Sequence, residues 1–160
     1  ASMYPAAPPP AGAPGGGQLS RAQVLALATA ECSAHFQDLD PRWPAAIAEV
    51  ESGRGANLYR WEAHLNDASV GLCQTLVSTA QWMYTDMGAT AAGYPTRDTL
   101  LDHRVSMYFC CAYLRYLTSY GGSRRGEEWV VRAYNGGPAW ERSAKGATAH
   151  YWRKYQSARF

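Results

Sequence analysis

The chain has 160 residues, 47% of them hydrophobic, and a formal net charge of +2. That length and composition suit one domain with a substantial core, no apolar run is long enough to cross a bilayer, and the basic side chains are too sparse for a nucleic-acid-binding surface. Residues 121–160 carry eight basic and three acidic side chains, which indicates either a solvated basic face or a surface for an anionic polymer or membrane.

The first 18 residues are rich in proline and glycine and contain few apolar side chains. This composition predicts a linker or extended arm, and a protein partner joined through the arm is one candidate use for it. We therefore divide the chain into an arm, residues 1–18, and a folded domain, residues 19–160.

Helical signals follow in chain order. Ser20 and Gln23 form a capping box before a helix expected over residues 21–35. A second helix is expected to begin between Pro41 and Pro44 and to end at Gly53. Residues 57–67 lack a clean period and predict either a loop with a short helical turn or a small hairpin.

Further segments complete the prediction. Residues 69–75 form a nearly apolar run with a glycine where backbone must approach closely. Three more helices are expected, one from a second capping box at Ser78 and Gln81 to Met87, one over residues 103–120 capped by Asp102, and one from Glu127 to the Asn135-Gly136-Gly137-Pro138 stop. A last helix is expected from a Thr148 cap. No segment is rich in strand signals, so the predicted fold class is all-α.

Glu51 is the principal candidate for chemistry. It follows Ile47 and Val50 at helical spacing, so it shares the core-facing stripe, whereas Glu49 projects to the opposite side. Low polarity and the negative end of the helix dipole both disfavour ionisation, so we expect a raised pKa suited to a general acid. The structural alternative is a glutamate that reaches solvent or pairs with an arginine.

The cysteines and histidines show no metal-site spacing, and no metal or other cofactor is expected. The neighbours Cys110 and Cys111 point about 100° apart on a helix and are not expected to bond each other. Buried free thiols are favoured over a disulfide from Cys32 or Cys73 to one of that pair.

Three segments in order resemble one family. Residues 46–52 (AIAEVES) resemble the catalytic Glu-Ser helix end of the soluble lytic transglycosylase (SLT) domain, residues 69–75 (SVGLCQT) its Gly-Leu-Met-Gln segment, and residues 133–138 (AYNGGP) its Ala-Tyr-Asn-Ala-Gly-Pro segment. The likeness covers residues 20–156, and it looks closest to the short versions of plants and green algae. Cys73 replaces the usual Met, Val77 the common Pro, and Gly136 the usual Ala, which we expect to let backbone approach the cleft.

The resemblance implies a lysozyme-like helical domain related to goose-type lysozyme, with a long central helix. It implies a glycan polymer as substrate, either peptidoglycan or a related N-acetylglucosamine polymer, cleaved at a β-1,4 bond with Glu51 as the single general acid and base and a 1,6-anhydro product. The substrate-binding residues carried over or inferred beside it are Ser52, Gln74, Tyr134, Asn135 and Tyr151. For the two tyrosines, core packing is the structural alternative. For Ser52, the alternative is a cap at the helix end.

Two other functions stay open. Goose-type relatives add water with the help of an aspartate, and Asp67 lies in the comparable loop as a candidate second carboxylate, against the alternative of a turn aspartate. A non-catalytic scaffold is the third, because plants and algae contain little murein. The sequence does not fix the compartment, although an extracytoplasmic, secreted or plastid location is favoured over the cytosol.

Overall fold

The computed structural model describes residues 17–160, and it is mainly helical, which confirms the predicted fold class. The helices are α1 (Arg21–His35), α2 (Arg42–Ser52), α3 (Val77–Met87), α4 (His103–Thr118), α5 (Glu127–Gly136), α6 (Trp140–Ser143) and α7 (Lys145–Ala158). Short 3-10 turns occupy Ala63–Leu65, Thr99–Leu101 and Tyr120–Gly122. The predicted arm, residues 1–18, lies outside the described residues except for Gly17 and Gln18.

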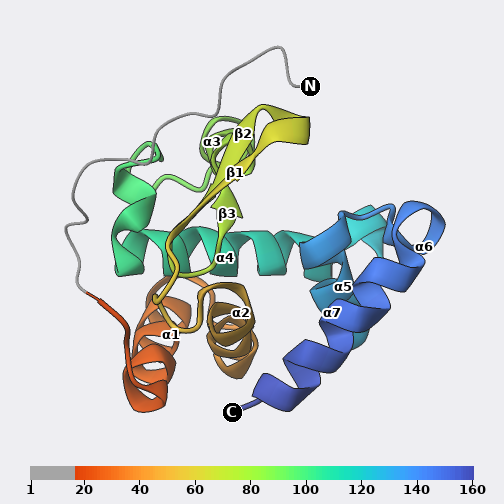
Figure 1. Cartoon of the computed structure of the whole chain (residues 1–160), viewed down its shortest axis with the longest axis horizontal. Helices are drawn as coiled ribbons and strands as arrows, with labels where there is room; N and C mark the ends of the chain where they lie inside the picture. The colour runs from red at the N-terminus through yellow and green to blue at the C-terminus, as the bar shows by residue number, and fades with distance from the viewer. Residues whose placement is uncertain (1–16) are drawn as a thin grey trace.

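The central element is α4. It crosses the middle of the molecule, with α1 and α2 on one side, the sheet and α3 on the other, and α5, α6 and α7 grouped at one end (Figure 1). Most of its residues are buried, and it contacts α1, α2, α3 and α5. A helix covered on several sides needs apolar residues around most of its circumference, which explains the aromatic and aliphatic composition of this stretch.

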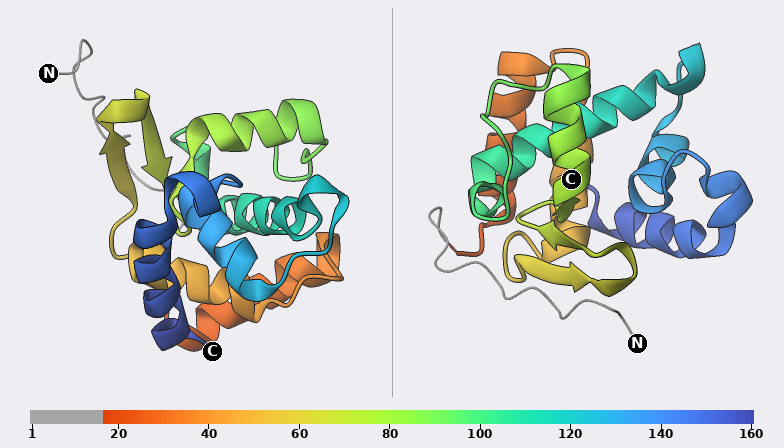
Figure 2. Two further views of the ribbon diagram at one scale, coloured as in Figure 1. Left: turned by 90° about the vertical axis from the view of Figure 1, so that its right-hand side faces the viewer. Right: turned by 90° about the horizontal axis from the view of Figure 1, so that it is seen from above.

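A small antiparallel sheet was missed by the all-helical prediction. Its strands are β1 (Tyr59–Glu62), β2 (Asp67–Val70) and β3 (Thr75–Leu76), in the order β1-β2-β3. Tyr59 pairs with Val70 and Glu62 with Asp67, so the hairpin that was one of two options for residues 57–67 is present. Figure 2 shows this hairpin projecting at the edge of the helical body.

Two predicted helix starts are wrong. Ser78 lies inside α3, whose N-cap is Leu76, and Thr148 lies inside α7, whose N-cap is Ala144. Thr148 is fully buried and its hydroxyl bonds to Ala144 O at 2.7 Å. In contrast, the Ser20–Gln23 capping box is present in both directions.

The four cysteines are free and buried, as predicted. Cys32 and Cys111 come from α1 and α4, and their sulfur atoms are 3.9 Å apart. They contribute to the core between these helices as small apolar side chains.

Candidate active site

Glu51 lies in the last turn of α2, at the point where the helix is forced to end. Gly53 takes a left-handed conformation with φ of 59°, and its N–H bonds to the carbonyls of Ala48 and Glu49. The preceding residues Ala45–Ala48 are fully buried, which fixes the orientation of the helix. Glu51 is half-buried and faces a cleft, whereas Glu49 faces away and pairs with Arg54 and Arg21.

The Glu51 carboxyl has an altered acidity. Burial raises its pKa from 4.5 to about 7, against the hydrogen bond from Tyr151 and the charges of Arg60 and Lys154, while the charge of Glu62 raises it further. Tyr151 donates its hydroxyl to Glu51 Oε2 at 2.9 Å, and burial raises the pKa of this tyrosine far enough that it stays a donor. At neutral pH the carboxyl can therefore both donate and accept a proton.

The cleft in front of Glu51 has a volume of about 490 Å³. This is within the range of pockets that hold small molecules or a few sugar units of a longer polymer. Its two sides come from opposite parts of the chain, the β-hairpin with β3 and the end of α5. The lining residues are Glu51, Arg60, Glu62, His64, Leu65, Ser69, Gln74, Thr75, Leu76, Thr79, Tyr113, Tyr134, Asn135, Gly136 and Gly137.

The Gly71–Gln74 segment places Gln74 in the lining of the cleft. A Cβ atom on Gly71 would lie 2.0 Å from Leu100 O, so only glycine fits there. Gln74 has a φ of 52°, unusual for a residue with a side chain, and its amide donates to Gly71 O at 3.0 Å. Tyr134 donates to Cys73 O at 2.8 Å and so joins α5 to this segment. Its hydroxyl is therefore directed at the backbone rather than at Glu51.

Comparison with protein families gives one match, and it covers most of the chain. The family model described as the transglycosylase SLT domain matches residues 30–156. The chain belongs to the SLT family. No curated protein matches the sequence significantly. SLT domains are lytic transglycosylases, which cleave the glycan strands of peptidoglycan, and this places the chain in the lysozyme-like class of enzymes.

Four predicted site residues line the cleft of this SLT domain or touch its acid. Gln74, Tyr134 and Asn135 line the cleft, and Tyr151 bonds Glu51 from α7. Together with Glu51 they come from segments up to 100 residues apart. Their contacts with substrate remain predictions.

Ser52 does not line the cleft, and of its two expected roles the structure shows the contact at the helix end. Only 2% of its surface is exposed, and its hydroxyl donates to Leu72 O at 2.6 Å and accepts from Gly55 N at 2.8 Å. The side chain thus closes the end of α2 and ties it to the Gly71–Gln74 segment.

Asp67 is also outside the cleft. Its Oδ1 accepts from Ala68 N at 2.8 Å, and its Oδ2 accepts from the backbone N and the hydroxyl of Ser78. Asp67 therefore supplies the acceptor for the first turn of α3 that the sequence assigned to a Ser78 capping box. With these bonds made inside the fold, it does not face Glu51.

Glu62 is the cleft carboxylate that the sequence analysis missed. It lies on β1, accepts from Ser69 Oγ at 3.0 Å, and is 3.5 Å from Arg60 Nε. The signal was the spacing of Arg60 and Glu62, because residues two apart on a strand share a face. This spacing indicates a shared face only if residues 57–67 form a hairpin.

Neither a metal cluster nor a membrane span is found in the part of the chain that the structure describes. Residues 17–160 contain no group of three His, Cys, Asp or Glu side chains suited to a metal ion. None of their helices combines the length and apolar character needed to span a bilayer.

Proposed function

We propose that this SLT domain cleaves the β-1,4 bond next to an N-acetylmuramic acid unit of peptidoglycan, with Glu51 as the single acid and base and a 1,6-anhydro product. The observation that carries the proposal is a half-buried carboxyl with a pKa of about 7, bonded to Tyr151 and facing a cleft of about 490 Å³. A pKa near the working pH lets one group act first as acid and then as base.

The reaction has two proton transfers. Protonated Glu51 gives its proton to the glycosidic oxygen as the bond from this oxygen to C1 breaks, and the hydrogen bond from Tyr151 stabilises the carboxylate that remains. The carboxylate then takes the proton of the C6 hydroxyl while O6 bonds to C1. This closes the anhydro ring, consumes no water and returns Glu51 to its protonated form.

Substrate recognition is proposed for the polar groups around the acid. Gln74 and Asn135 each offer an amide donor and acceptor to the acetamido and hydroxyl groups of the sugars. Tyr134 offers a ring face, because its hydroxyl is already bonded to Cys73 O. The left-handed backbone of Gln74 is a strained conformation of the kind found at functional sites.

The test is product analysis. The chain is incubated with purified murein in ¹⁸O-labelled water, and the muropeptides are analysed by mass spectrometry. We expect anhydro-muropeptides without ¹⁸O from the wild type and none from Glu51→Gln. Reducing ends that carry ¹⁸O would contradict the anhydro product and identify a hydrolase.

Hydrolysis is the second candidate function, and Glu62 is the observation that favours it. This carboxylate lines the same cleft as Glu51, and in other glycosidases a second carboxylate in the cleft activates water. If hydrolysis occurs, Glu62→Gln should reduce ¹⁸O incorporation by about 100-fold, the contribution of a general base. Asp67→Asn is the control, because Asp67 lies outside the cleft.

We also propose that the chain is an SLT domain of the short plant and green-algal type, and that a protein partner binds through the arm. Absence of cleavage of both murein and chitin oligomers by the wild type would leave the scaffold function and reject both enzymatic ones.

A further inference from the structure

A second groove lies between α2 and α7, separate from the catalytic cleft. Its volume is about 440 Å³. Most of its lining residues belong to α7, the helix whose Tyr151 donates a hydrogen bond to Glu51. The lining residues are Glu49, Val50, His150, Arg153, Lys154, Ser157 and Ala158.

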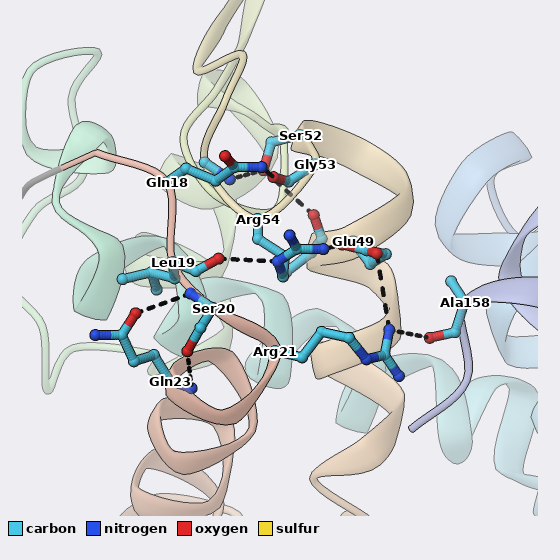
Figure 3. A network of polar contacts seen from close by, with 12 residues as sticks. Gln18, Leu19, Ser20, Arg21, Gln23, Glu49, Ser52, Gly53, Arg54 and Ala158 are labelled. Carbon is cyan, nitrogen blue, oxygen red and sulfur yellow. Dashed lines mark hydrogen bonds and ion pairs between the residues drawn. The ribbon is translucent and has the colours of Figure 1, made fainter.

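The charge of this groove is positive and uncompensated. Of the described residues that line the groove, only Glu49 has a carboxylate. This carboxylate is already paired with Arg54 and, at 3.7 Å, with Arg21 (Figure 3). Arg153 and Lys154 are exposed, and neither has a carboxylate partner within the described range. Two free cations on adjacent residues are suited to an anionic ligand, with Arg as a fork and Lys as a point charge.

The groove is close to the reacting centre. Val50 precedes Glu51 on α2, and His150 and Lys154 flank Tyr151 on α7, one residue before it and three after it. The charge of Lys154 also acts on Glu51 and lowers its pKa. The groove is therefore formed by immediate chain neighbours of Glu51 on α2 and of Tyr151 on α7.

We propose that this groove binds the carboxylates of the peptide stem attached to the muramic acid unit in the catalytic cleft. The proposal rests on the proposed function, because only a peptidoglycan strand carries such a stem. A neutral chitin strand offers nothing to two cations, whereas the stem carries free α- and side-chain carboxylates. His150 supplies a further hydrogen-bond partner.

The first test measures binding without catalysis. The free stem tetrapeptide L-Ala-D-Glu-meso-diaminopimelate-D-Ala is titrated into the chain, and backbone amide shifts are followed by NMR. We expect shifts in α7 and at Val50 and a Kd that rises about tenfold in Arg153→Gln/Lys154→Gln, from loss of two charge-assisted contacts. Arg124→Gln/Arg142→Gln removes the same charge elsewhere and should keep the wild-type Kd.

Three results would overturn the proposal. They are equal weakening in both double variants, shifts confined to the catalytic cleft, and groove binding of polyglycerol phosphate without binding of the tetrapeptide. The last result would assign the groove to a phosphate polymer.

The second test compares substrates. The ratio of kcat/KM on intact murein to that on strands stripped of peptide by an amidase should fall about tenfold in Arg153→Gln/Lys154→Gln and stay constant in the control pair. An unchanged ratio in the groove variant contradicts the proposal. If the wild type cleaves neither substrate, the proposed function fails, and the tetrapeptide titration still decides the groove.

Discussion

Glu51 costs the folded protein stability at the pH where it is proposed to work. Burial makes its charged form unfavourable, and the single hydrogen bond from Tyr151 does not offset that burial. A carboxyl retained in such surroundings indicates a trade of stability for reactivity, which is common at active sites.

This trade gives the first prediction. The Glu51 pKa is 4.5 as the reference for the unfolded chain and about 7 when folded, so between these pH values the folded state keeps a proton that the unfolded state has lost. The contribution of the protonated Glu51 carboxyl to the free energy of unfolding is complete below pH 4.5 and is lost as the pH rises through 7. Glu51→Gln should therefore be more stable than the wild type at about pH 8, by up to about 3 kcal/mol. Urea unfolding from about pH 4.5 to about pH 8 tests it, and parallel curves for both proteins would contradict it.

A second prediction concerns Tyr151. Its hydrogen bond lowers the pKa of Glu51, so Tyr151→Phe should raise that pKa further above 7. The alkaline limb of the kcat/KM profile, where the acid loses its proton, should move to higher pH. We also expect kcat to fall about tenfold, since one charge-assisted bond that positions the carboxyl is lost. If kcat falls but the alkaline limb of the kcat/KM profile does not move, Tyr151 acts only through packing.

The residue scale also shows what the sequence could and could not predict. Glu51 was found because helical periodicity and Gly53 fix its direction locally. The sequence could not tell which of Asp67 and Glu62 faces the cleft. That depends on which carboxylate is hydrogen-bonded to residues elsewhere in the fold. Asp67 is occupied by Ser78, eleven residues away, while Glu62 faces the cleft because β1 pairs with β2.

At the scale of elements, local signals succeeded where the partner groups were local. The Ser20–Gln23 box formed because its groups are exposed and its two partners are three residues apart. Thr148 failed as a cap because its hydroxyl accepts from Arg132 Nε at 3.2 Å inside the α5–α7 interface. Burial of a residue that has good cap chemistry is a tertiary effect that sequence spacing does not contain.

Gly136 gives the prediction at this scale. A Cβ atom there would lie 2.5 Å from Thr148 Cγ2 and 3.1 Å from Ala144 Cβ, so the glycine lets α7 pack against the end of α5. Gly136→Ala, which restores the residue usual in the family, should destabilise the chain by about 1–3 kcal/mol through overpacking. Thr148→Ser removes the clashing methyl and keeps the hydroxyl, so the same Gly136→Ala change should cost less in that background. Chemical denaturation of the wild type, the two single variants and the double variant measures the coupling.

That double-mutant cycle has a clear negative result. If Gly136→Ala costs the same in the wild-type background and in the Thr148→Ser background, the methyl is not the obstacle, and the close α5–α7 approach is not what requires glycine.

On the scale of the whole molecule, the two ends of the described chain meet at α2, the helix that carries Glu51. Gln18 donates to Gly53 O at 3.0 Å, and Leu19 exchanges backbone and side-chain bonds with Arg54. Figure 3 shows this network extending through Arg21 to Ala158. Such long-range contacts are invisible to periodicity, although they hold the segment that presents Glu51.

Arg21 provides the prediction at this scale. Its guanidinium donates to Arg159 O at 2.9 Å and lies 3.9 Å from the centre of the Phe160 ring, besides its ion pair with Glu49. The side chain is 46% exposed, so the ion pair itself is worth little. Arg21→Met, which keeps the apolar stem, should therefore lower stability by only about 1 kcal/mol while releasing the last turn of α7.

The measurement is amide hydrogen exchange, which resolves local opening from global unfolding. In Arg21→Met the amides of the last turn of α7 should exchange at least about tenfold faster, while those of α4 change only in line with the small global loss. Arg42→Met is the matched control, because the guanidinium of Arg42 is bonded to Asp40, two residues away in the same segment. Equal acceleration in both variants would show that loss of a cation, rather than loss of the tie between the chain ends, frees this turn. Acceleration confined to Arg21→Met would make the joined ends the support of the helix that carries Tyr151.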